Sequence, residues 1–135
     1  MLLIDTGIFV AAADRTEPHH IACAALLRNE TDLAVTSSTI PEAAWLIETR
    51  LGPPAEARFL NLISSSRFTI IELTHNDYQR AISLINTYTD LGLGFVDASI
   101  IAVAERLGET TIATLNHRDF AVVRPAHCGA FKLVP

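Results

Sequence analysis

The segment Leu2-Leu3-Ile4-Asp5-Thr6 decides the fold, because three consecutive aliphatic residues are followed directly by an acid and a hydroxyl. A continuous apolar run is typical of a strand covered on both faces, and such strands belong to parallel sheets with helices above and below. In open sheets of that kind, ligands bind beyond the carboxyl ends of the strands. Asp5 therefore lies where chemistry would be placed, although an aspartate that simply ends a strand at a turn explains this segment equally well.

Further strands and helices alternate along the rest of the chain. Apolar and β-branched runs predict strands at residues 32–36, 68–73, 110–115 and 131–134. Helical spacing, caps and breakers predict helices at residues 7–13, 18–29, 41–51, 55–63, 75–90 and 96–107. Short connections between these elements predict one α/β domain over residues 1–135, with a mainly parallel sheet of four to five strands. In the helix at 75–90, Tyr78, Ile82 and Ile85 recur at helical spacing, and the simplest interpretation places them in the core.

Length and composition exclude several classes of protein. With 135 residues, half of them hydrophobic, the chain can form one domain with a real core and is not of the disordered type. No apolar run reaches the ~20 residues of a membrane span, and the start lacks the features of a signal peptide, so we expect a cytoplasmic protein with no membrane partner. Cys23 and Cys128 lie far apart and in no metal-ligand spacing, which favours buried free thiols over a disulfide. The net charge of −5 argues against bulk electrostatic binding of nucleic acid but leaves local phosphate contacts open, since every basic residue except Lys132 is an arginine.

Four acids and one amide are expected at the same edge of the sheet. Asp5 ends the first strand, Glu42 and Asp97 lie in the first turns of two helices, and Asn116 and Asp119 follow the fourth strand. Strand carboxyl ends and the N-termini of the helices that follow them lie on one edge, so all five residues project toward one rim. Taken singly, each helix-terminal acid is explained as well by the helix dipole, which contributes about 0.3–1 kcal/mol.

A cluster of these acids would need neutralisation. Two carboxylates ~4 Å apart repel by about 4 kcal/mol at an effective dielectric near 20, so such a cluster persists only with protons or a cation. Oxygen ligands without His or Cys suit Mg²⁺ or Mn²⁺ rather than Zn²⁺. Mg²⁺ held by one or two carboxylates keeps several waters and typically meets phosphate oxygens of a substrate. The chemistry indicated is metal-assisted phosphodiester hydrolysis.

Four motifs in a fixed order carry a family resemblance. Leu3-Ile4-Asp5-Thr6 opens the chain, Pro41-Glu42 lies in the middle, Gly94-Phe95-Val96-Asp97-Ala98-Ser99-Ile100 follows, and Ala113-Thr114-Leu115-Asn116-His117-Arg118-Asp119-Phe120 lies near the end. Each motif alone is weak, but the ordered set spans nearly the whole chain and is fairly specific. The chain resembles a PIN-domain ribonuclease, in particular the VapC-like toxins of prokaryotic type II toxin–antitoxin pairs.

The resemblance implies an α/β/α sandwich, homodimerisation, Mg²⁺-dependent RNA cleavage and inhibition by a cognate antitoxin protein. It implies that Asp5 and Asp97 ligate the metal, that Glu42 completes the acidic pocket and that the Thr6 hydroxyl helps to orient it. Arginines suit bidentate phosphate contacts, and Arg15 and Arg118 are the candidates for contacting RNA. The helices around Trp45 and Phe59 are apolar enough to offer an antitoxin groove.

One departure from the family pattern concerns Asn116, which stands where such toxins often carry an acid. Asparagine keeps a carbonyl oxygen but loses the charge, so a second metal ion would bind less well. Asp119 supplies the missing carboxylate if the segment turns at that point, and compensation by Asp119 is our hypothesis.

Two other functions are weighed against this one. A catalytically weakened PIN-like module would bind RNA or a protein partner without cutting, which the replacement of an acid by Asn116 makes a real alternative. A phosphoryl-transfer enzyme with an aspartate nucleophile would also place Asp5 after the first strand, but phosphatases of that kind want a second aspartate where this chain has Gly7.

Overall fold

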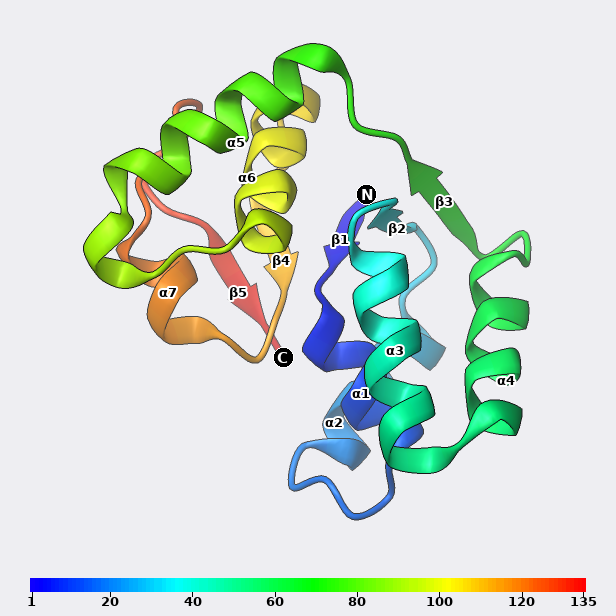
Figure 1. Cartoon of the computed structure of the whole chain (residues 1–135). Helices are drawn as coiled ribbons and strands as arrows, with labels where there is room; N and C mark the ends of the chain where they lie inside the picture. The colour runs from blue at the N-terminus through cyan, green and yellow to red at the C-terminus, as the bar shows by residue number, and fades with distance from the viewer.

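A five-stranded parallel sheet forms the centre of the molecule in the computed structural model, which describes residues 1–135 (Figure 1). The strands are β1 (Leu2–Ile4), β2 (Leu33–Thr36), β3 (Phe68–Ile71), β4 (Thr111–Ala113) and β5 (Lys132–Val134). Their order is β3-β2-β1-β4-β5, and every neighbouring pair is parallel. The α/β prediction is therefore confirmed, and the sheet is wholly rather than mainly parallel. The opening strand β1 occupies the central position, where both faces are covered.

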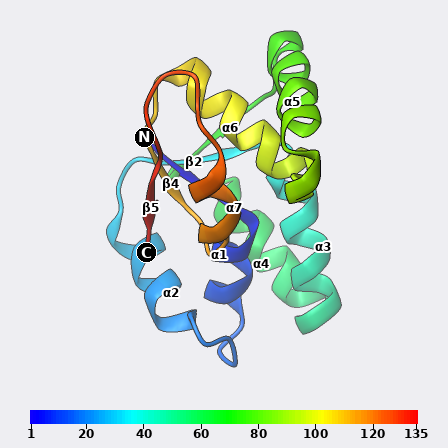
Figure 2. The ribbon, with the colours of Figure 1, turned by 90° about the vertical axis from the view of Figure 1, so that its left-hand side faces the viewer.

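Helices cover both faces of this sheet. Helices α1 (Thr6–Ala13), α2 (His20–Asn29), α3 (Thr39–Leu51) and α4 (Pro53–Ile63) pack with one face. Helices α5 (His75–Thr87), α6 (Phe95–Leu107) and α7 (His117–Val122) pack with the other, and a 3₁₀ turn, η1 (Thr89–Leu91), precedes α6. Figure 1 shows the two groups on opposite sides of the strands, and Figure 2 shows both chain ends on the side away from α3 and α5.

The strands supply alternate side chains to two hydrophobic cores. In β1, Ile4 packs in the core with α1 to α4, whereas Leu3 packs in the core with α5 to α7. Phe9 fills the first core and meets the ring of Phe59 edge-on, with 5.1 Å between the ring centroids. Because both faces of β1 are buried, the aliphatic run needs no polar alternation, as the first residues of the sequence predict.

The stripe expected in the core of α5 is wrong for two of its three residues, and only Ile85 packs against the core, partly buried. Tyr78 and Ile82 are about half exposed, at 49% and 52%, while Ala81 and Leu84 face the core. Helical spacing identifies residues that share a face but not which face is covered. The neighbouring stripe is the covered one.

Several element boundaries also differ from the predicted ones. Helix α2 begins at His20 instead of Pro18, and α4 begins at Pro53 instead of Ala55. A short helix, α7, follows β4, where no helix was predicted. Neither cysteine forms a disulfide; Cys23 is buried as expected, whereas Cys128 is only half-buried. None of the helices combines the length and hydrophobicity required to cross a bilayer.

Candidate functional site

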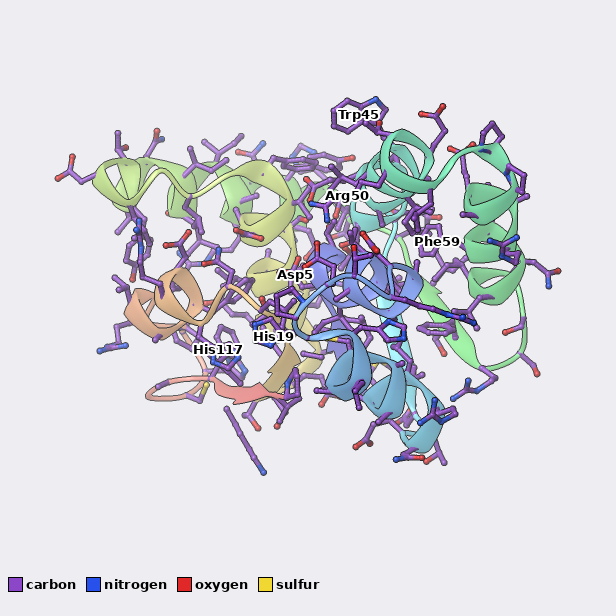
Figure 3. The ribbon with its side chains drawn as sticks, turned by 90° about the horizontal axis from the view of Figure 1, so that it is seen from below. Asp5, His19, Trp45, Arg50, Phe59 and His117 are labelled. Atoms are coloured by element: carbon purple, nitrogen blue, oxygen red, sulfur yellow. The ribbon has the colours of Figure 1, made fainter.

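An open pocket of about 500 Å³ lies at the carboxyl edge of the sheet and brings together four chain segments. Its polar lining consists of Asp5, Thr6, Glu42, Asp97 and Asn116. These residues come from the β1–α1 junction, the first turn of α3, the first turn of α6 and the segment after β4. Figure 3 shows Asp5 near the middle of the molecule when this edge is viewed from below. The structure thus gathers residues that are far apart in the sequence, as the parallel topology requires.

Asp5 is a buried carboxylate held in place by two donors. It caps α1, where its Oδ1 accepts a hydrogen bond of 2.7 Å from the backbone N–H of Thr6, and its Oδ2 accepts one of 2.7 Å from the Thr114 hydroxyl. Burial raises the pKa of Asp5, these two hydrogen bonds oppose that rise, and the charge of Glu42 adds to it. Each carboxylate oxygen retains a further lone pair. Asp5 is therefore a rigid oxygen donor that can still accept a cation.

Asp97 is the most strongly perturbed acid of the pocket. It lies half-buried in the first turn of α6. Burial raises the pKa of Asp97 to about 7, with further contributions from the negative charges of Asp5, Glu42 and Asp119. An ordinary aspartate titrates about three units lower. Without a cation, this carboxyl therefore takes up its proton near neutral pH, far above the range of an ordinary aspartate.

Asn116 bridges two of the acids. Its Nδ2 donates to Asp119 Oδ2 at 3.0 Å and, more weakly, to Asp97 Oδ2 at 3.4 Å. Its Oδ1 accepts from the backbone N–H of Asp119 and so caps α7. The segment does turn here, which brings the carboxylate of Asp119 toward Asp97. Where related toxins often carry a negatively charged acid, Asn116 thus offers N–H groups that donate hydrogen bonds to the neighbouring carboxylates.

The sequence and structure of this chain match a known family. The model of the PIN domain family matches residues 2–124. The chain belongs to the PIN domain family. It is 29% identical over 135 residues to Ribonuclease VapC26 of Mycobacterium tuberculosis, a match that covers 99% of this chain and 100% of that protein.

Solved structures share the PIN fold with this chain. VapC20 of Mycobacterium tuberculosis, described as a sarcin-ricin loop cleaving toxin, has a TM-score of 0.78 at 18% identity, over 83% of this chain and 87% of that one. A toxin–antitoxin complex from Klebsiella pneumoniae has a TM-score of 0.67 at 22% identity, over 100% of this chain and 97% of that one. VapBC2 from Rickettsia felis, bound to a DNA fragment from its promoter, has a TM-score of 0.68 at 19% identity, over 98% and 96% of the two chains.

The acidic pocket of this PIN domain suits a hard divalent cation. All its polar lining groups are oxygen donors apart from the amide nitrogen of Asn116. The hydroxyl of Thr6 is buried beside Asp5 and has no hydrogen-bond partner. No three His, Cys, Asp or Glu side chains approach closely enough to form a complete ligand set. Mg²⁺ takes one or two carboxylates and fills its other positions with water, so an open pocket of this kind fits it.

A relay of hydroxyl groups, not anticipated from the sequence, joins the start of α3 to α6. Thr36 Oγ1 lies 2.8 Å from both Thr39 Oγ1 and Ser38 Oγ, and Ser38 Oγ lies 2.6 Å from Ser99 Oγ. Ser99 donates to the carbonyl of Val96 at 2.7 Å. A hydroxyl has only one proton to donate, so donation runs from Thr39 through Thr36 and Ser38 to Ser99.

This relay ties together the two helices that carry Glu42 and Asp97. Glu42 follows Ser38 in the first turn of α3, and Ser99 follows Asp97 in α6. The sequence contained one signal for it, the run of hydroxyl residues from Thr36 to Thr39. That run does not indicate a partner on α6, because Ser99 is 61 positions from Ser38.

Replacing Ser99 with alanine should destabilise the protein by about 1–3 kcal/mol, because Ser38 then loses its buried acceptor. Ser38→Ala should cost a similar amount, and the double variant should fall short of the sum by at least about 0.5 kcal/mol. Urea unfolding of the four proteins measures these differences. Strict additivity would contradict the relay.

The two arginines expected at the pocket lie in different surroundings. The Arg118 side chain is 80% exposed and pairs with Asp119 at 3.2 Å, so it lies beside the acids. Arg15 instead lines a separate cavity formed by α1 to α4, and the structure does not bring it to the acidic pocket. Arg15 follows the end of α1, and α1 begins beside Asp5 and runs away from the acids.

Proposed function

We propose that this PIN-domain protein is a metal-dependent endoribonuclease that acts as the toxin of a type II toxin–antitoxin pair. The observation that carries this proposal is the shared pocket of Asp5, Glu42 and Asp97, in which burial and mutual repulsion raise the pKa of Asp97 to about 7. The full-length similarity to a protein named as a ribonuclease supports it.

Each side chain then has a distinct role in hydrolysis. Asp5 and Asp97 would hold Mg²⁺, or Mn²⁺, which activates a water and neutralises charge on the scissile phosphate when bound. Glu42 is exposed at the rim of the pocket, where its carboxylate can accept a proton from the attacking water. The buried Thr6 hydroxyl has no other partner and orients a ligand of the pocket. Exclusion of bulk water is partial, because the pocket is open.

Cleavage-site mapping on total RNA tests this function directly. The wild type with Mg²⁺ should cut RNA at defined sites, and Asp5→Asn should cut none of them. RNA binding without cleavage by the wild type would favour a binding module, which the bridging amide of Asn116 makes the second candidate.

Asp119 is expected to matter for cleavage, because it supplies the carboxylate that Asn116 lacks. Asp119→Asn should lower kcat by about tenfold to a hundredfold, the range seen when groups that orient metal ligands are removed. The matched control is Asp90→Asn, which removes an acid of η1. An unchanged rate for Asp119→Asn, with cleavage lost in Asp97→Asn, would refute compensation by Asp119.

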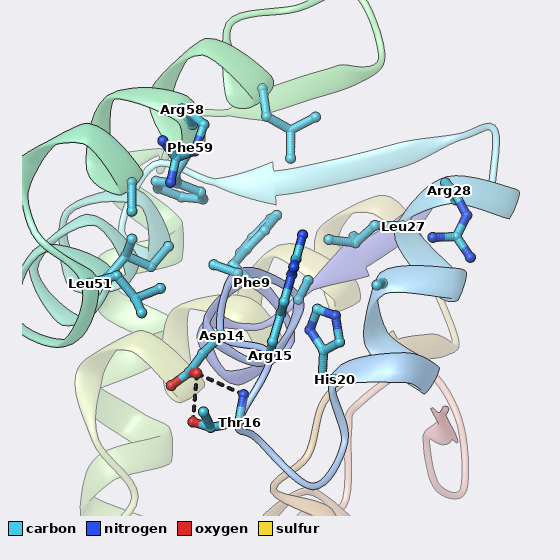
Figure 4. A pocket seen from close by; sticks show the side chains of 16 residues that line it. Phe9, Asp14, Arg15, Thr16, His20, Leu27, Arg28, Leu51, Arg58 and Phe59 are labelled. Atoms are coloured by element: carbon cyan, nitrogen blue, oxygen red, sulfur yellow. Dashed lines mark hydrogen bonds between the residues drawn. The ribbon is translucent and has the colours of Figure 1, made fainter.

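We also propose that the antitoxin occupies the cavity formed by α1 to α4. This cavity has a volume of about 740 Å³, larger than the acidic pocket, and most of its lining is hydrophobic (Figure 4). Phe9, Leu51 and Phe59 contribute apolar surface. Arg15, Arg28 and Arg58 also line it, and each of their side chains is free of ion pairs. An antitoxin segment with an apolar stripe and flanking acids would complement this surface.

Arg58→Glu should weaken binding of the cognate antitoxin by about tenfold or more, because it places a negative charge where an acid is expected. Cleavage of RNA by the isolated protein should stay unchanged. Isothermal titration with the antitoxin measures the first effect, and a cleavage assay the second. Equal affinity for both proteins would argue against this groove. Two roles have been considered for Arg15, contact with RNA and contact with the antitoxin, and Arg15→Glu separates them. A loss of RNA cleavage without a loss of antitoxin binding would show that Arg15 contacts the RNA.

The remaining proposals concern assembly and location. Tyr78 and Phe95 stack on the surface at 5.8 Å and an interplanar angle of 13°, and Ile82 is exposed one turn from Tyr78. A second copy of the chain that covers these side chains would form a homodimer, which sedimentation measures directly. Two free cysteines suit a cytoplasmic protein.

A further inference from the structure

The acidic pocket continues into a second, smaller cavity along α3. This second cavity has a volume of about 180 Å³ and shares Gly7, Leu46 and Leu115 with the acidic pocket. Its far end is lined by Arg50 and Glu17. The two cavities therefore form one groove, with carboxylates at one end and a guanidinium at the other.

The spacing of α3 explains why these groups face the same groove. Glu42, Leu46 and Arg50 are four residues apart, so they lie on one face of the helix. Eight residues of helix separate the backbones of Glu42 and Arg50 by about 12 Å. The groove thus extends from the acids, past the apolar side chains of Leu46 and Leu115, to the guanidinium of Arg50.

Gly7 keeps the passage between the two cavities open. A Cβ placed on Gly7 would lie 3.7 Å from Leu115 Cβ, at ordinary contact distance. Any longer side chain would fill the space that the two cavities share.

The only side chain that pairs directly with Arg50 is Glu17, from the loop between α1 and α2, although the Asp14 carboxylate is close enough for its charge to act on Arg50. The side chains of Arg50 and Glu17 are both partly exposed, at 44% and 27%. An ion pair at such exposure is weak, because water screens both charges. The two non-bridging oxygens of a phosphate diester can accept a bidentate pair of hydrogen bonds from a guanidinium, as a carboxylate does, so a phosphate can replace Glu17 at little cost.

We propose that the second cavity binds a phosphate of the RNA strand that flanks the scissile one, with Arg50 exchanging Glu17 for the phosphate oxygens. This inference rests on the proposed ribonuclease function and adds a substrate subsite to it. Glu17 holds Arg50 in the free protein and competes with the RNA. The three arginines of the α1–α4 cavity play no part, because none of them lines this groove.

The alternative role for the pair is a clamp that fastens the α1–α2 loop to α3, and two variants separate the roles by sign. Arg50→Gln removes the phosphate contact, so KM for a single-stranded RNA substrate should rise about tenfold while kcat changes little. Glu17→Gln removes the competitor, so KM should fall. A clamp predicts the same direction for both variants, since both lose the same ion pair and with it the same stability.

Three further measurements complete the test. Binding of a labelled single-stranded RNA to the variants in an Asp97→Asn background should show the same opposite shifts without catalysis. The slope of log affinity against log salt should decrease by about 0.7 for Arg50→Gln, as for one lost phosphate contact. Lys132→Gln, which removes an equal charge at the start of β5, should change neither quantity.

The outcomes distinguish this inference from the function on which it rests. If the wild type neither cuts nor binds RNA, the proposed function fails. If the wild type cuts RNA in a metal-dependent way but Arg50→Gln and Glu17→Gln shift KM in the same direction or not at all, only the subsite is overturned.

Discussion

Asp97→Asn is expected to abolish RNA cleavage and, in the same protein, to raise stability at pH 8 when no divalent cation is present. Loss of a carboxylate at the reacting centre should reduce kcat by about 10³-fold or more. The gain in stability follows from the raised pKa of Asp97, which is about 7 in the folded protein against 3.8 for the free group. An acid that stabilises the fold has a lowered pKa in the folded protein, so the raised pKa of Asp97 means that its ionised form destabilises the fold. The direction of the stability change in Asp97→Asn therefore tests this argument.

Between pH 4 and 7 the folded state holds the Asp97 proton and the unfolded state does not. Stability therefore falls as the pH rises through this window, and the cost is complete above pH 7. With allowance for partial exposure, asparagine should recover about 1–3 kcal/mol at pH 8. The recovery should shrink toward zero as the pH approaches 4. Urea unfolding in EDTA at several pH values measures it.

Asp77→Asn is the matched control for this prediction. Burial acts to raise the pKa of Asp77, but hydrogen bonds from Arg106 and from Thr74 outweigh it and leave the pKa below its ordinary value. Asp77 therefore stabilises the fold at neutral pH, and Asp77→Asn should lower stability at pH 8. If Asp97→Asn lowered stability as well, the argument that burial and repulsion make the Asp97 charge destabilising would be refuted.

The affinity for Mg²⁺ should rise about tenfold per pH unit below 7 and level off near pH 8, because the cation must displace the proton of Asp97. The raised pKa of Asp5 acts in the same direction. Isothermal titration between pH 5.5 and 8.5 measures the affinity without any need for turnover. Removal of the metal with EDTA should abolish cleavage, and added Mg²⁺ should restore it.

Asp97→Asn should flatten this pH profile, because the main competing proton is gone, while the residual affinity falls. Glu105→Gln serves as a control, since Glu105 pairs with Arg80 and lies outside the pocket. An affinity that is independent of pH in the wild type would contradict the assignment of Asp97 as a metal ligand.

Local sequence patterns were sufficient for the elements that carry the acids. The aliphatic run before Asp5 predicts a strand buried on both faces, and β1 is the central strand of the sheet. Glu42 and Asp97 lie in first helical turns, as expected from Pro41 beside Glu42 and from the glycine-containing break before Asp97. Parallel topology then requires these acids to share one edge. This part of the site could be predicted because strand and helix periods are local properties.

The surroundings of the acids were not predictable in the same way. The relay from Ser38 to Ser99 joins residues 61 positions apart, and the groove that links Arg50 to the acids depends on Leu115 lying beside α3. The cavity that Arg15 lines was not predictable either, because a residue after a helix can point to either side of it. Each of these features depends on which segments pack together.

The sequence by itself determined the alternation of strands and helices, the buried first strand and the helix-terminal positions of the acids, since short-range periodicity and capping decide them. Only the tertiary structure decided which stripe of α5 is exposed, which donor lies beside Asp97 and where the arginines point. Those features are set by contacts between distant segments. The periodicity of a helix or strand identifies the residues that share a face, but it does not identify the segment that packs against that face.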